Sequence, residues 1–122
     1  MPPLVAAMLV GGCAAEVVRR PADFTARTDD PRYVVLQPAM FRLDSGYERT
    51  IPSGTKFAGA GRVREGAVLR PVETVFTIEG RHMHEAYLVL NGNQLVGFYL
   101  PVEKAFSPLS RPVELTIEER KN

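Results

Sequence analysis

The chain has 122 residues, which leaves room for one domain of ordinary size, and its formal net charge is +1. So small a charge argues against nucleic-acid binding, which needs a clustered basic face. A hydrophobic content of 45% with ten Gly and ten Pro argues against a disordered chain and indicates a folded, turn-rich domain.

The amino terminus reads as an export segment. It begins MPPLVAAMLVGGCAA, with no charged side chain, an apolar run over residues 4–10 and two glycines before Cys13. An apolar core followed by small residues is typical of a signal peptide. The run is shorter than the roughly 20 apolar residues needed to cross a bilayer. We therefore expect residues 1–12 to be a signal peptide that is removed.

The segment Val10-Gly11-Gly12-Cys13 resembles the bacterial lipobox, in which an aliphatic residue and two small residues precede an obligatory cysteine. The resemblance implies that Cys13 receives a diacylglycerol on its sulfur, becomes the first residue and in many bacteria gains a third acyl chain such as palmitate. Two or three acyl chains hold a protein on a membrane almost permanently. Gly11 stands where the family more often has Ala or Ser, and no basic residue precedes the run, which leaves open a true start upstream of Met1. The alternative is that Cys13 is a small buried hydrophobe of a cytosolic domain.

The residue after the cysteine bears on the destination. Lipoproteins with Asp at that position resemble those retained at the inner membrane, and this chain has Ala14. In an organism with two membranes, the resemblance implies the outer membrane, facing the periplasm. Residues 13–31 are then expected to form the lipidated cysteine and a flexible tether, because 16–31 is polar, contains two prolines and has no regular period.

Residues 32–122 are predicted to form one small all-β domain, because strand signals alternate with turn residues and no window has the spacing of a long helix. About six to eight short, mainly antiparallel strands would make a small barrel or sandwich. The glycine-rich stretch 55–63 predicts bulges, and Pro71 predicts an edge or a corner. Residues 101–112 are expected to be a loop, and 113–119 the last strand, with Glu114, Thr116 and Glu118 outward.

The clearest element is a hairpin over 85–100, EAYLVLNGNQLVGFYL. Asn-Gly between apolar runs is a strong hairpin signal, since a type I′ turn needs positive φ at both central residues. A turn at Asn91-Gly92 would place Leu88 opposite Leu95, and His84 opposite Tyr99. Because both faces are apolar, the hairpin is expected in the centre of the sheet.

The body of the domain also resembles a group of uncharacterised small lipoproteins of Gram-negative bacteria. The resemblance lies in GTKFAGAGRV from Gly54 and TVFTIEGRHMHEAYLVLNGNQLVGFYLP from Thr74. It implies only a fold and a location, because no activity is agreed for the group.

One polar cluster, Arg81-His82-Met83-His84-Glu85, precedes the best strand. Residues two apart on a strand share a face, so His82 and His84, completed by Glu85, could ligate Zn, Cu or Ni. Two histidines supply at most half of a tetrahedral shell, and the chain has no third. The simpler alternative is that His84 packs against Tyr99 and His82 is solvated.

The remaining polar residues form no catalytic pattern: the serines lack a nucleophile elbow, and no glycine-rich phosphate loop precedes a helix. We therefore expect no enzyme activity and no cofactor. The leading hypothesis is a membrane-anchored envelope lipoprotein that acts as a non-enzymatic binding or structural module, with an envelope protein or the cell wall as its partner. The alternative is a small β-barrel that binds a metal or small ligand through His82, His84 and Glu85.

Overall fold

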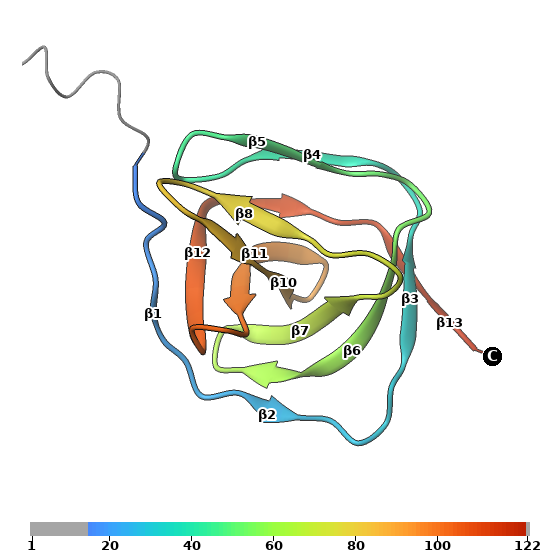
Figure 1. Ribbon diagram of the computed structural model, residues 1–122. Helices are drawn as coiled ribbons and strands as arrows, with labels where there is room; N and C mark the ends of the chain where they lie inside the picture. Colours follow the sequence, from blue (N-terminus) through green and yellow to red (C-terminus); the bar gives the residue numbers. More distant parts are fainter. Residues whose placement is uncertain (1–14, 122) are drawn as a thin grey trace, which may run out of the picture.

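The computed structural model describes residues 15–121, which contain thirteen β-strands and no helix (Figure 1). The all-β prediction is confirmed. The strands outnumber the six to eight expected because several are pieces of only two to four residues. The expected signal peptide and the lipobox-like segment ending at Cys13 lie outside the described residues.

The strands in chain order are β1 Arg20–Pro21, β2 Thr25–Ala26, β3 Arg32–Val35, β4 Ala39–Arg42, β5 Glu48–Ile51, β6 Lys56–Val63, β7 Gly66–Pro71, β8 Thr77–Glu79, β9 Met83–Glu85, β10 Tyr87–Asn91, β11 Gln94–Leu100, β12 Ala105–Glu114 and β13 Ile117–Arg120. Nine of them form one antiparallel sheet in the order β1-β12-β11-β10-β7-β6-β3-β13, with β2 paired to β6. The hairpins β4–β5 and β8–β9 form two small sheets of their own. Figure 1 shows the main sheet curling around the centre of the molecule. Among the described residues β1 and β13 do not pair, so the sheet stays open.

The larger hydrophobic core lies between the main sheet and the two small sheets. Phe98 of β11 is at its centre, with ring centroids 5.9 Å from both Phe41 of β4 and Phe76, which precedes β8. Strand β4 follows the period of two that a half-buried strand requires, with Ala39 and Phe41 inward and the residues after them exposed. Burial of these alternating side chains holds the small sheets on the large one.

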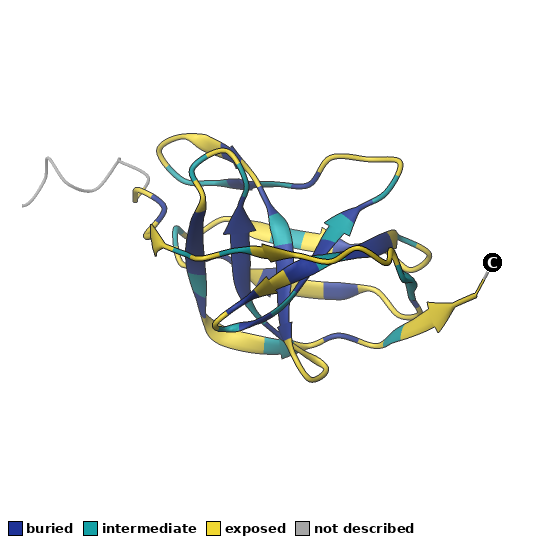
Figure 2. Ribbon diagram, turned by 90° about the horizontal axis from the view of Figure 1, so that it is seen from below, coloured by how far each residue is buried: buried dark blue, intermediate teal, exposed yellow. Residues whose placement is uncertain are grey.

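A second, smaller cluster occupies the outer face of the main sheet, and the N-terminal segment covers it. Phe24 stacks on Tyr99 of β11, with ring centroids 4.8 Å apart and an interplanar angle of 16°. Ala22 packs against the same cluster, which includes Phe106 of β12. Figure 2 shows exposed residues along this segment and buried ones on the strands behind it.

Residues 15–31 therefore do not form the flexible tether that their polar sequence predicted. Strand β1 pairs with β12, β2 pairs with β6, and Val17 is buried in the main core. The segment docks because its few apolar side chains, Val17 and Phe24 above all, fill positions that the sheet leaves open. The folded domain thus includes residues that were assigned to the linker.

The hairpin of β10 and β11 is confirmed, and it is central, between β7 and β12. Its register differs from the prediction, because the two turn residues are Gly92 and Asn93 and Asn91 pairs with Gln94. A bulge then leaves Val96 unpaired, so that Leu88 faces Phe98 rather than Leu95. Positive φ at Gly92, the first turn residue, matches a type II′ turn.

Residues 105–114, most of which were expected to be a loop, form the ten-residue strand β12. Proline is tolerated there because β1 pairs only with Ala105 and Phe106, so Pro108 has no neighbour on that side to which it must donate. Pro112 lies in an irregular stretch opposite Val96, where the ladder is interrupted. The predicted last strand is likewise divided at the buried Leu115. The bulge expected in the glycine-rich β6 is present between Gly59 and Gly61.

Candidate functional site

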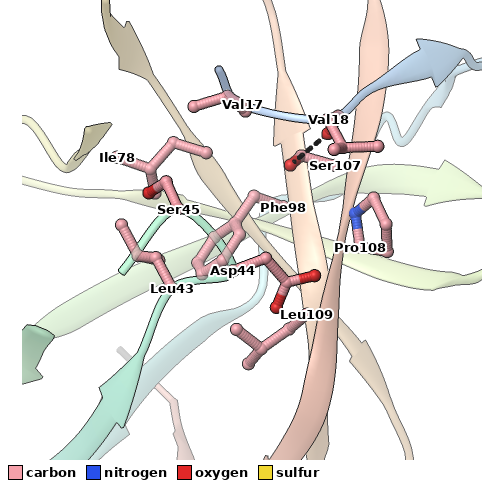
Figure 3. A pocket seen from close by; sticks show the side chains of 10 residues that line it. All are labelled: Val17, Val18, Leu43, Asp44, Ser45, Ile78, Phe98, Ser107, Pro108 and Leu109. Carbon is pink, nitrogen blue, oxygen red and sulfur yellow. Dashed lines mark hydrogen bonds between the residues drawn. The ribbon is translucent and has the colours of Figure 1, made fainter. Parts of the chain in front are cut away.

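The pocket drawn in Figure 3 is a small cavity between the N-terminal segment, the β4–β5 loop and β12. Its volume of about 10 Å³ is close to that of a single water site. Polar groups that line the cavity already have hydrogen-bond partners. The Ser107 hydroxyl donates to the Val18 carbonyl at 2.7 Å. The Asp44 carboxylate accepts from the backbone amide and the hydroxyl of Ser110 at 2.8 and 2.7 Å. The cavity has no room for an organic ligand.

A wider surface depression of about 420 Å³ lies near the ends of β3 and β13. Its lining includes Arg32, Lys56 and Arg120, which would favour an anion. Each of these three cations lies within 2.9 to 3.9 Å of a carboxylate of its own, however. Lys121 also lines the depression, so the charge of three of its four cations is offset by a neighbouring carboxylate.

The two histidines are not brought together. His82 lies just before β9 with its side chain exposed, and its Nδ1 is 3.3 Å from Oε2 of Glu16 in the N-terminal segment. His84, two residues on, is buried, and its Nδ1 is 2.7 Å from Oε2 of Glu103 in the β11–β12 turn. The two rings have separate carboxylate partners in separate segments.

The structure therefore does not form the metal site considered for His82, His84 and Glu85. Glu85 is exposed on β9 opposite Thr77, and no group of three His, Cys, Asp or Glu side chains within residues 15–121 could hold a metal ion. The simpler alternative is right about His82, which is solvated. It is wrong about His84, because Tyr99 pairs with Tyr87 and stacks on Phe24 instead.

The His84–Glu103 pair is the most unusual polar feature of the domain. Burial alone would raise the pKa of Glu103, but hydrogen bonds from His84 and from the backbone, with the positive charges of His84 and Arg19, lower that pKa overall. Nε2 of His84 and Oε1 of Glu103 are also buried without a hydrogen-bond partner among the described residues. No local sequence pattern indicates this pair, because its members are 19 positions apart in a turn and a short strand.

The same contacts define a surface that we call the N-terminal face: residues 15–19, the β8–β9 tip (80–83) and the β11–β12 turn (101–104). The amide of Arg81 donates to the Ala15 carbonyl at 3.0 Å, and Glu16 meets His82. The turn joins through the Glu103–His84 contact. In Figure 1 these segments lie on the left of the molecule, opposite the C-terminus.

The hydroxyl groups do not form a catalytic set with the histidines. The Ser110 hydroxyl bonds to Asp44, and those of Ser53 and Ser107 donate to backbone carbonyls. Residues 15–121 contain no helix of the length and apolarity needed to cross a bilayer. Among known proteins, no family model, no curated protein and no solved structure matches the chain at a significant level.

Proposed function

We propose that the protein is a lipid-anchored lipoprotein of the bacterial cell envelope, and that its β domain is a non-enzymatic binding or structural module. The observation that carries the proposal is the sequence Val10-Gly11-Gly12-Cys13 directly after the apolar run over residues 4–10. Ala15, whose carbonyl accepts a hydrogen bond from the Arg81 amide of the β domain, follows the cysteine by two residues, which is a suitable place for an anchor. Ala14 favours the outer membrane, with the domain in the periplasm.

The chemistry of the described residues supports binding over catalysis. Within residues 15–121 the histidines lie beside carboxylates, and the cavity beside the N-terminal segment has about the volume of one water site. An envelope protein or the cell wall is the partner class that such a module would engage. The metal-binding alternative has no observation in its favour, since its three residues diverge.

Replacing the sulfur tests the anchor, because a serine hydroxyl cannot form the thioether that carries the diacylglycerol. We expect Cys13→Ser to move the protein from the membrane to the soluble fraction and to abolish incorporation of radiolabelled palmitate. Ala14→Ser is the matched control, since it keeps the sulfur and should remain in the membrane. Unchanged fractionation of Cys13→Ser would contradict the proposal.

A further inference from the structure

We propose that the N-terminal face lies flat on an anionic phospholipid bilayer, so that the anchored domain has one fixed side towards the membrane. The inference rests on the proposed lipid anchor at Cys13 and adds to it an orientation and a second membrane contact. It commits to a lipid surface as the occupant of this face.

The chain between the proposed anchor and the domain is short. The Ala15 carbonyl accepts a hydrogen bond from the Arg81 amide, and the Val18 carbonyl accepts one from the Ser107 hydroxyl. Val17, between them, is buried in the core. Two residues, at about 3.3–3.6 Å each, reach about 7 Å from Cys13 to Ala15. A flexible tether of 18 residues would instead have spanned about 23 Å on average. The docked segment therefore keeps Ala15, at the edge of this face, within about 7 Å of the proposed anchor.

The chemistry of the N-terminal face also suits a lipid surface. Three large apolar side chains are exposed on it: 64% for Val18, 67% for Met83 and 75% for Val102. Each belongs to a different segment of the face: Val18 to the N-terminal segment, Met83 to the β8–β9 tip and Val102 to the β11–β12 turn. Exposed apolar side chains next to an anchor can enter the headgroup region, where a water-soluble surface would have polar ones.

The N-terminal face also carries exposed positive charges. Each of the three segments adds one exposed cation: Arg19, Arg81 and Lys104. Within residues 15–121 no carboxylate lies within ion-pair distance of these three, although Arg19 is near enough to Glu16 and Glu103 to help lower their pKa values. Exposed cations around exposed apolar side chains complement an anionic lipid surface.

The absence of tryptophan from the chain makes a direct test simple. We would introduce Met83→Trp or Val102→Trp into the full-length protein, purify the anchored product and reconstitute it into vesicles of phosphatidylcholine and phosphatidylglycerol that contain brominated lipid. We expect both tryptophans to be strongly quenched, because the apolar side of such a face enters about 5–10 Å into the headgroup and acyl boundary. Val75→Trp is the matched control: Val75 is 69% exposed but precedes β8 at the far end of the hairpin.

Charge is tested in the same system. Adding Arg81→Gln should weaken the contact about fivefold in anionic vesicles, because each cation near such a surface contributes about a fivefold affinity. The substitution should have little effect in vesicles of pure phosphatidylcholine. Equal effects in both lipids would contradict the anionic part of the inference.

Failure of the anchor and failure of the face give different results. If the purified protein carries no lipid, the proposed function is wrong. Cys13, the only cysteine in the sequence, is then coupled to a maleimide lipid in the same vesicles. Quenching of the tryptophans still reports whether the face contacts the bilayer. Quenching at positions 83 and 102 but not 75 supports the face with either anchor. Tryptophans at 83 and 102 that are quenched no more than the one at 75 overturn it, and would instead leave this surface for a protein partner.

Discussion

Single glycines set several close approaches in this fold. A Cβ added at Gly61 would lie 2.7 Å from the ring of Phe24, and one added at Gly97 would lie 2.5 Å from the Ser107 carbonyl oxygen. Real side chains do not tolerate such distances, so β6 can accept the N-terminal segment, and β11 can accept β12, only because these residues lack a side chain. Gly92 differs, since its surroundings are open but its φ is +63°.

We expect Gly92→Val to lower the free energy of unfolding by more than about 1 kcal/mol, because a β-branched residue is strained at positive φ. The open space around position 92 removes steric overlap as a second cause. Gly92→Asn is the control and should cost less, since asparagine adopts this conformation more readily. Thermal melts decide the matter, and equal melting temperatures for wild type and Gly92→Val would contradict the turn.

The lowered pKa of Glu103 predicts a pH dependence of stability. A carboxyl whose pKa is lower in the folded state than the ordinary value of 4.5 stabilises the fold above that pH, and the contribution is lost as the pH falls through the folded pKa. We expect the stability of the wild type to fall more steeply than that of Glu103→Gln below pH 4.5. Urea unfolding from pH 7 to about pH 3 measures the free energy of unfolding of both proteins. The contributions of the other carboxylates cancel in the difference between wild type and Glu103→Gln. Parallel curves would show that the His84 contact does not stabilise the carboxylate.

Among the strands, local sequence patterns predicted turns and strand positions but not the contacts between distant segments. The Asn-Gly pair and the apolar runs around it gave the central hairpin, but its exact register depends on a bulge at Val96 that only the neighbouring strands fix. The prolines within 105–114 indicated a loop rather than a strand. A proline lacks the N–H that a strand donates, but this costs nothing where no neighbouring strand accepts it, and the sequence does not show where β1 ends. The polar composition of 16–31 predicted a tether, although two of its apolar side chains, Val17 and Phe24, pack on the domain. Their partners are distant in the sequence, so no local pattern indicates this packing.

The docking of the N-terminal segment depends on Gly80 at the β8–β9 tip. A Cβ there would lie 2.6 Å from the Ala15 carbonyl oxygen and 2.8 Å from Val17 Cγ2. We expect Gly80→Ala to displace residues 15–18 and to cost about 1–3 kcal/mol, as overpacking usually does. Faster amide exchange confined to this segment and the tip would show it. Met83→Ala, which changes an exposed residue of the same hairpin, is the control and should leave amide exchange unchanged. Unchanged amide exchange in Gly80→Ala would contradict the docking of residues 15–18 at this tip.

At the scale of the whole molecule, the two ends of the described chain lie on opposite sides (Figure 2). The N-terminal segment covers the outer face of the sheet, and the sheet ends in β13, whose exposed Glu118, Glu119 and Arg120 discourage pairing with other chains. An anchor at one end would thus leave the other end free to meet a partner. The sequence predicted the all-β class from its turn-rich composition, whereas the histidine partners depend on tertiary contacts that it does not encode locally.

We propose that Cys13 carries the lipid that holds this domain in the envelope. The most direct measurement is the intact mass of the protein extracted from cell envelopes, with fragmentation of its first peptide. We expect a chain that begins at Cys13 and bears a diacylglycerol on the sulfur. A chain that retains residues 1–12 and a free thiol at Cys13 would contradict it.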